Sequence, residues 1–213
     1  MVKDNQDRPT MLLSHYYDGL TEAGCDEAGR GCLAGSVYAA AVILPDGYEN
    51  AEINDSKKLS DRQRRRLRTV IEHDALAWAV GVVTAAEIDR INILNAAILA
   101  MHRALDALTL RPQAVIVDGN RFYKYRDLPH TTIVKGDAKY LAIAAAAILA
   151  KTYRDDYMIE LDRMYPQYGW SVNKGYPTKQ HREAIRAYGT SPYHRRTFNL
   201  TGDREQTIDF GDF

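Results

Sequence analysis

The sequence predicts an α/β fold in one domain. Short apolar segments typical of strands alternate along the chain with longer segments whose apolar residues recur at helical spacing. The chain has 213 residues, of which 46% are hydrophobic, and this is enough for one substantial core but short for two. It contains no internal repeat and no low-complexity linker. We therefore expect a single domain over residues 1–213.

The first elements are predicted to be a β-hairpin and an amphipathic helix. Gly24 to Glu27 and Gly35 to Leu44 have strand character and are separated by a glycine-rich turn. The next segment, Ser60 to His73, opens with a residue favoured as a helix N-cap. Its apolar residues recur at helical spacing beneath a basic face, which predicts a helix with one buried side.

The middle of the chain continues the alternation. Leu76 to Thr84 is a strand candidate, and Ala85 to Leu110 carries apolar residues at helical intervals, in one helix or two, before a proline ends the pattern. Ala114 to Val117 and Thr131 to Val134 are short apolar strand candidates. These segments supply the remaining strands of the sheet.

A long buried helix is predicted next, roughly from Ala138 to Met164. Its alanine-rich part is small and apolar on all sides, so we expect it to lie against the sheet. After Tyr165 the chain becomes rich in loops, and a short helix follows from about Lys179 to Tyr188. The domain should therefore consist of an α/β core over about 20–165 and a helical extension and tail over about 166–213.

Basic residues gather in two segments, although the formal net charge of the chain is zero. Lys57 to Arg68 contains seven basic residues and one acid, and Lys174 to Arg196 contains six and one, so the rest of the chain is acidic. Clustered Lys and Arg are what phosphate binding requires. Charge runs are also common on solvated helix faces, so charge alone leaves a nucleic-acid partner open.

The sequence predicts a cytoplasmic protein without a membrane segment. The first ten residues are polar, and the longest apolar run, Leu141 to Ala150, is too short to span a bilayer. Cys25 and Cys32 match no zinc or redox motif. We expect them to be small, reduced packing residues.

Four acids lie beside predicted strands or the long helix. Asp26 and Glu27 end the first strand, Asp118 follows an apolar strand and Asp137 precedes the long helix. Each has an ordinary alternative, namely a charged strand end for the first pair and an N-cap for Asp137. If the four converge, they suit Mg²⁺ or Mn²⁺ in phosphoryl transfer. Chain order does not show that they converge, and no GxxxxGK[ST] loop points to a nucleotide-dependent phosphotransferase.

Seven motifs of the chain resemble, in order, those of bacterial ribonuclease HII, and they cover nearly all of it beyond about the first 20 residues. They are CDEAGRG (25–31), LAGSVYAAAVIL (33–44), NDSKKLS (54–60), VDGN (117–120), KGDAKYLAIAAAAILAKTYRD (135–155), GYPT (175–178) and HRRTF (194–198). The resemblance implies a ribonuclease-H-like fold, which is a five-stranded mixed sheet flanked by helices with a small helical C-terminal extension.

The resemblance also implies a metal-dependent endonuclease. Such an enzyme hydrolyses the RNA strand of RNA–DNA hybrids and nicks duplex DNA 5′ to embedded ribonucleotides, leaving 5′-phosphate and 3′-hydroxyl ends. It removes misincorporated ribonucleotides and RNA primers. Asp26, Glu27, Asp118 and Asp137 match the family's four metal-binding carboxylates, which hold two Mg²⁺ or Mn²⁺ ions in the catalytic complex. We expect a monomer.

Substrate recognition is implied for two further motifs. Gly29, Arg30 and Gly31 match a turn whose backbone contacts the 2′-hydroxyl, the group that separates RNA from DNA. Tyr176 matches a tyrosine that packs on the sugar of the nucleotide after the ribonucleotide and so senses an RNA-to-DNA junction. The ordinary alternatives are tight turns with solvent-facing side chains. The candidates for contacts to phosphates, or for positioning phosphates and acids, are Ser56, Lys57, Lys58, Lys139, Lys151 and Arg154.

Other functions are weighed on the same residues. A non-catalytic hybrid- or DNA-binding module is disfavoured because carboxylates facing phosphates hinder binding unless metals intervene. Ribonuclease HIII carries an extra N-terminal domain, for which about 20 residues are too few. The tail Gln206–Phe213 fits a sliding-clamp-binding peptide poorly, so we do not expect it to bind a clamp. His181 and His194 lie in the extension, where a histidine can tune product release, but we expect both to be packing or surface residues.

Overall fold

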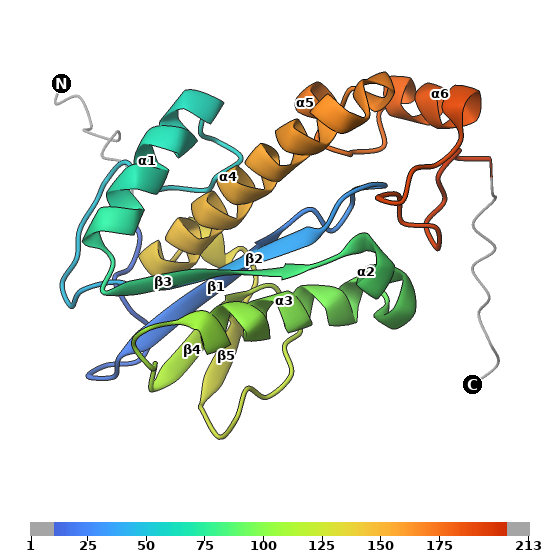
Figure 1. Ribbon diagram of the computed structural model, residues 1–213. Coiled ribbons are helices and arrows are strands. Elements are labelled where there is room, and N and C mark those ends of the chain that lie inside the picture. The colour runs from blue at the N-terminus through green and yellow to red at the C-terminus, as the bar shows by residue number, and fades with distance from the viewer. Residues whose placement is uncertain (1–10, 204–213) are drawn as a thin grey trace, which may run out of the picture.

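The computed structural model describes residues 11–203, which form a five-stranded mixed sheet with helices on both faces (Figure 1). The strand order is β3-β2-β1-β4-β5, and β1 is antiparallel to β2 but parallel to β4. The strands are β1 (Glu22–Ala28), β2 (Val37–Ile43), β3 (Ala77–Val83), β4 (Ala114–Asp118) and β5 (His130–Ile133). The helices are α1 (Asp61–Asp74), α2 (Ala85–Ile91), α3 (Ile93–Ala107), α4 (Leu141–Met164), α5 (Trp170–Asn173) and α6 (Lys179–Tyr188), with 3₁₀ turns η1 (Gly136–Ala138) and η2 (Pro166–Tyr168). The predicted fold class is confirmed.

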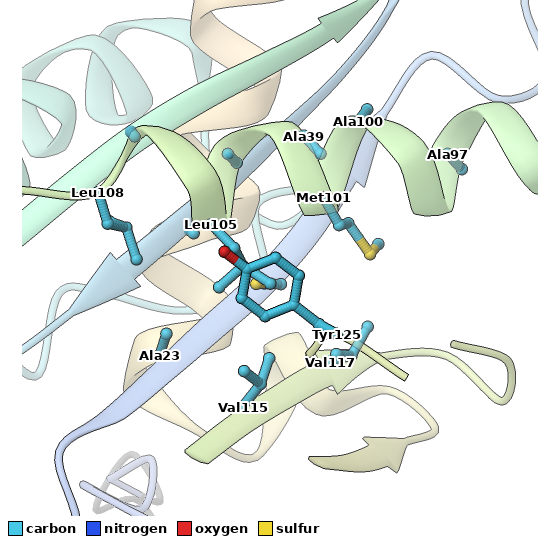
Figure 2. Close-up of a cluster of buried hydrophobic side chains, with 14 of the residues drawn as sticks. Ala23, Ala39, Ala97, Ala100, Met101, Leu105, Leu108, Val115, Val117 and Tyr125 are labelled. Carbon is cyan, nitrogen blue, oxygen red and sulfur yellow. The ribbon is translucent and has the colours of Figure 1, made fainter. Parts of the chain in front are cut away.

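The sheet separates two hydrophobic cores because successive side chains of a strand point to opposite faces. On one face, Met101 and Leu105 of α3 pack over Ala23 of β1 and Val115 of β4, as Figure 2 shows. On the other face, α1 and α4 pack against β2. The helix α5 packs beside the C-terminal half of α4, where Trp170 shares a buried cluster with Met158 and Leu161, and α6 lies farther out (Figure 1).

Small residues let α4 approach the centre of the sheet closely. Ala40 of β2 is fully buried in one cluster with Ala144 to Ala146 of α4, which are fully buried as well. A Cβ atom added to Gly24 would lie 2.3 Å from the backbone carbonyl carbon of Ala142. The alanine-rich sequence of α4 is therefore matched by equally small residues on the strands beneath it.

The start of α4 differs from the sequence prediction. The helix begins at Leu141 rather than near Ala138, and its N-cap residue is Tyr140. Asp137 lies before it in η1, so the N-cap interpretation of Asp137 is wrong. The cause is a parallel contact with the N-terminal segment, in which Leu13 N–H donates to Lys139 O and Leu13 O accepts from Leu141 N–H.

Several smaller expectations are also tested by the structure. The helical pattern over 85–110 forms two helices, because Asn92 adopts a φ of 63° between them. Cys25 and Cys32 are buried and free, which confirms them as packing residues. None of the helices in residues 11–203 is both long and apolar enough to cross a membrane.

Candidate active site

The parallel pairing of β1 and β4 brings two of the predicted acids side by side. Cys25 pairs with Val117, so Asp26 and Asp118 occupy the next position on the two neighbouring strands. Asp26 is buried, whereas Asp118 is partly exposed at the last residue of β4. This edge of the sheet is where α/β proteins usually build their sites.

The other two acids reach the same edge from different directions. Glu27 follows Asp26 and, because side chains alternate, lines a small cavity against α3, while Asp26 faces α4. Asp137 comes from η1, and this turn is tied to β4 because Gly136 N–H donates to Asp118 Oδ1 at 2.7 Å. The structure therefore brings all four predicted carboxylates to one end of the sheet.

Burial and neighbouring carboxylates raise the pKa values of Asp26, Glu27 and Asp137. Burial, followed by the charges of Glu27 and Asp118, raises the pKa of Asp26 well above that of an ordinary aspartate. Burial and the charge of Asp118 raise the pKa of Asp137, and Asp55 raises it further. Burial also raises the pKa of Glu27, while Arg30 lowers it. Four ionised groups in this space are therefore unstable without positive charge beside them.

Two side-chain cations lie beside the acids. Arg30 Nη1 is 3.3 Å from Glu27 Oε1, and Lys57 Nζ is 3.8 Å from Asp137 Oδ2. Both cations are largely exposed, and the Lys57 side chain is 84% exposed, so these ion pairs are weak. They offset only part of the repulsion among the four carboxylates.

A divalent cation fits this donor set. Mg²⁺ and Mn²⁺ take carboxylate oxygens and retain positions for water and phosphate oxygens. Within residues 11–203, no three acidic, His or Cys side chains are already arranged around one ion position. Asp26 Oδ1 accepts from Glu27 N–H at 2.6 Å, and Gly136 N–H fixes one oxygen of Asp118, so each of these two groups keeps its other oxygen for an ion.

Asp55, in the NDSKKLS segment, is a further acid at this site, and the sequence motifs assign it no role. Its charge and a side-chain hydrogen bond raise the pKa of Asp137, so it lies beside the four carboxylates. The motif itself was the available signal. It drew attention to Ser56, Lys57 and Lys58 as phosphate contacts, and its acid was passed over.

The Gly29–Gly31 turn rests on two buried arginines. Gly29 has a φ of +97°, and a Cβ there would lie 2.0 Å from Arg154 Nε. The carbonyl of Arg30 accepts from Arg195 Nη1 at 2.9 Å, whereas a Cβ built on Gly31 meets no atom of residues 11–203 within 4 Å, its two chain neighbours aside. Arg154 and Arg195 therefore hold the Gly29 and Arg30 side of the turn in place, and Gly31 faces open space.

Arg154 corrects one expectation. Its side chain is fully buried and donates to the carbonyl oxygens of Ser36, Lys174 and Ala34 at 3.1, 2.9 and 3.1 Å. The buried guanidinium does not reach a phosphate, so the predicted role of Arg154 in positioning phosphates or acids can be exerted only through this backbone. Lys174, Ala34 and Ser36 belong to loops around the turn, so Arg154 orders the backbone there.

Tyr176 lies at the rim of the same site. Its side chain lines a cavity of about 260 Å³ together with Asp26, Glu27 and Asp118. The residue is 40% exposed, and its ring centroid is 5.9 Å from Lys151 Nζ. An exposed aromatic face beside this ammonium group is suited to contact a sugar and an adjacent phosphate.

The predicted phosphate candidates divide into two groups. Ser56, Lys57 and Lys151 line the cavity, although Lys151 is also paired with Asp155 at 2.6 Å. Lys58 and Lys139 are exposed and lie outside that lining. Basic groups therefore share the cavity with the acids.

The two basic segments are partly internal to the protein. Arg65 and Arg68 of α1 both pair with Asp156 of α4 at 2.7 Å. In the second segment, Arg195 is fully buried and Arg182 donates to main-chain carbonyls. Fewer of these basic side chains are therefore available to a ligand than the sequence suggests.

Gly29→Ala should lower stability and cleavage together. The new methyl group would overlap the Arg154 guanidinium, and φ of +97° is unfavourable for alanine. We expect a loss of about 2 kcal/mol in the free energy of unfolding and a displaced turn. Denaturant unfolding and cleavage assays on the same preparation measure both effects. Wild-type values in both assays would show that the turn tolerates the shift.

Comparisons with known proteins agree with this architecture. The model of the ribonuclease HII family matches residues 23–201. The ribonuclease HII of Phocaeicola vulgatus is 68% identical over 196 residues, which cover 92% of this chain and 98% of that protein. The ribonuclease HII of Bacteroides thetaiotaomicron is 66% identical over 200 residues, which cover 94% of this chain and all of that protein.

Solved structures of related ribonucleases also resemble this chain. Ribonuclease H2 from Pyrococcus horikoshii matches with a TM-score of 0.69 at 28% identity, over 85% of this chain and 95% of that one. Ribonuclease HII from Archaeoglobus fulgidus, solved in complex with PCNA, matches with a TM-score of 0.71 at 26% identity, over 89% and 99%. The chain therefore belongs to the ribonuclease HII family and is an endonuclease of the ribonuclease H type.

Proposed function

We propose that this enzyme uses divalent metal ions to hydrolyse the RNA strand of RNA–DNA hybrids and to nick duplex DNA on the 5′ side of embedded ribonucleotides. The observation that carries the proposal is the convergence of Asp26, Glu27, Asp118 and Asp137, each from a different position in the chain, on one end of the sheet. Such a cluster is costly in a folded protein unless cations bind it. In the cell the activity would remove misincorporated ribonucleotides and RNA primers from DNA in the cytoplasm.

The four carboxylates would hold two Mg²⁺ or Mn²⁺ ions, which supply an activated water and stabilise the departing 3′-oxygen when bound. Asp26 and Asp118 lie on the two central strands, Glu27 lies on the α3 side of the sheet, and Asp137 comes from η1. Ser56 and Lys57, which line the cavity, would receive the substrate phosphate. The products would carry 5′-phosphate and 3′-hydroxyl ends.

The backbone of Gly29, Arg30 and Gly31 would read the 2′-hydroxyl, which both donates and accepts hydrogen bonds. Support comes from the open space at Gly31, where a ribose can approach the main chain. The hydrogen bond from Arg195 to the Arg30 carbonyl, on the other side of the turn, fixes the position of these backbone groups. Tyr176, on the same cavity, would pack on the sugar of the following nucleotide.

Gly31→Ala tests this readout without disturbing the fold. A methyl group there meets no protein atom within 4 Å, so the melting temperature should stay at the wild-type value. We expect cleavage at a single embedded ribonucleotide to fall by about tenfold or more, because the methyl group would occupy the space of the ribose. Unchanged cleavage with unchanged stability would place the 2′-hydroxyl elsewhere.

The decisive experiment uses a labelled DNA duplex with one embedded ribonucleotide, together with Mg²⁺ or Mn²⁺. An all-DNA duplex, a long RNA–DNA hybrid and an EDTA reaction serve as controls. A metal-dependent nick 5′ to the ribonucleotide, absent from the all-DNA duplex, is the expected result. If neither ribonucleotide substrate is cleaved with either metal, a hybrid- or DNA-binding role becomes the better account.

Metal binding should also be visible without catalysis. Adding Mn²⁺ at about 100 times its dissociation constant should stabilise the native protein by about 2.7 kcal/mol, because the ion binds the folded state. Thermal melts with Mn²⁺ and with EDTA measure this shift. Asp118→Asn should show a much smaller shift, and an equal shift in both proteins would contradict a site that contains Asp118.

We further propose that the chain acts as one catalytic domain and as a monomer, with the extension over about 166–213 bordering the nucleic-acid groove. The tail Gln206–Phe213 lies outside the described residues, so the expectation that it does not bind a sliding clamp stays a prediction. Size-exclusion chromatography with light scattering tests the monomer.

A further inference from the structure

A buried chain of hydrogen bonds in the C-terminal extension ends at the main chain of Tyr176. It begins at Ser191, whose N–H donates to His194 Nδ1 at 2.9 Å. His194 Nε2 lies 3.2 Å from His181 Nε2, and His181 Nδ1 lies 2.9 Å from the carbonyl oxygen of Tyr176. Trp170 Nε1–H donates to His181 Nε2 at 2.9 Å. The expectation that these histidines are packing residues is correct for their burial but omits this connection.

The hydrogen-bond partners of the two histidines determine which ring nitrogen of each carries its proton. A backbone N–H can only donate, so His194 Nδ1 is an acceptor and its Nε2 carries the proton. His181 Nε2 receives hydrogen bonds from His194 and from Trp170, which leaves the proton of His181 on Nδ1. That N–H therefore donates to Tyr176 O. Each histidine must be neutral for the chain to form.

The surroundings keep both rings neutral. His181 is fully buried, and His194 is 1% exposed. Burial, followed by the charge of the neighbouring His181, lowers the pKa of His194 to about 4. Burial likewise lowers the pKa of His181. The rings of Trp170 and Tyr168 enclose the pair.

The segment around Tyr176 depends on this support. The Tyr176 carbonyl accepts both from His181 and from Thr178 N–H, at 2.9 and 2.8 Å, and Tyr176 N–H donates to Asn173 O at 2.9 Å. The phenol ring itself is half open to the cavity. The direction of the ring toward a ligand is therefore set mainly by how the main chain of this turn is held.

We propose that His181, oriented by His194 and Trp170, is a positioning residue for Tyr176, and that it sets how strongly the enzyme prefers an RNA-to-DNA junction. The inference rests on the proposed contact of Tyr176 with the sugar after the ribonucleotide. The residue after His194 adds to the argument, because Arg195 Nη1 donates to the carbonyl of Arg30 in the Gly29–Gly31 turn. Adjacent residues of the extension thus hold both proposed substrate-reading elements.

Two substitutions of His181 separate positioning from packing. In His181→Asn the amide nitrogen can take the place of Nδ1 and donate to Tyr176 O. In His181→Gln the amide lies at the place of Nε2, so the bond to Trp170 is retained and the bond to Tyr176 is lost. Tyr168→Phe is the matched control, because it removes a hydrogen bond to Gly189 O from the same aromatic cluster and leaves the chain to Tyr176 intact.

The measurement is the ratio of kcat/KM on a duplex with a single ribonucleotide to kcat/KM on a uniform RNA–DNA hybrid. The fraction of folded enzyme cancels in this ratio, so a loss of stability alone does not change it. We expect His181→Gln to lower the ratio by about tenfold or more, in the range of groups that orient a functional residue. His181→Asn and Tyr168→Phe should stay within about threefold of wild type.

A wild-type ratio in His181→Gln, or an equal fall in His181→Gln and His181→Asn or Tyr168→Phe, would overturn the inference. His194→Asn, which keeps the acceptor for Ser191 N–H but removes the donor to His181, gives a second reading and should also lower the ratio. Tyr176→Ala identifies a failure of the underlying proposal. If its ratio equals that of wild type, Tyr176 does not sense the junction and both proposals fall. If Tyr176→Ala loses the preference and His181→Gln keeps it, only the positioning role fails.

Discussion

Asp118→Asn should lower the cleavage rate by about 10³-fold or more while the protein stays folded. The amide oxygen of asparagine can still accept from Gly136 N–H, so the link between β4 and η1 is retained. What is lost is one negative charge at the centre of the site, and electrostatic groups that act on the transition state contribute effects of this size. Stability without metal should be equal or higher, because the substitution removes one of four mutually repelling charges.

Single-turnover cleavage of the single-ribonucleotide duplex measures this loss, and circular dichroism with thermal melting verifies the fold. Asp127→Asn is the matched control, since Asp127 is an almost fully exposed aspartate that pairs with Lys124 in the loop after β4. It should cleave at the wild-type rate. Full activity in Asp118→Asn would show that Asp118 is not a catalytic residue.

Gly24→Ala should destabilise the protein by about 3 kcal/mol, at the upper end of the usual cost of overpacking. The added Cβ would lie 2.3 Å from the backbone carbonyl carbon of Ala142 and 2.6 Å from the backbone nitrogen of Ile143. Both contacts are main-chain atoms of α4, so no side-chain rotation relieves them. Either β1 or α4 must move, and Asp26, two residues along β1, moves with the strand.

Chemical denaturation gives the change in free energy, and a thermal melt should show a decrease in Tm of about 10 °C for a chain of this length. Gly31→Ala, which adds the same methyl group where no protein atom lies within 4 Å, should melt with the wild type. A Gly24→Ala protein that melts with the wild type as well would mean that α4 is not packed on β1 as closely as described.

The sequence by itself determined the class and order of nearly all elements. Apolar periodicity is a local property, so the strands and helices from Gly24 to Met164 were predicted with small shifts at their ends. It also singled out Asp26, Glu27, Asp118 and Asp137, because acids at the ends of apolar strands or just before a long apolar helix are visible in the chain. The resemblance to ribonuclease HII then supplied an activity that periodicity could not.

The tertiary structure alone decided how those residues meet. The register of β1 with β4 places Asp26 beside Asp118, and the contact of Leu13 with Lys139 and Leu141 takes Asp137 out of the helix. The structure also shows that Arg154, a candidate in the sequence for positioning phosphates or acids, and Arg195, from the second basic segment, are buried and bonded to main-chain carbonyls. Burial and hydrogen-bond partners depend on segments far apart in the chain, so the connection from His194 through His181 to Tyr176 had no signal in local sequence. The physical reason is that residue type fixes which interactions a side chain can make, while packing fixes which of them it does make.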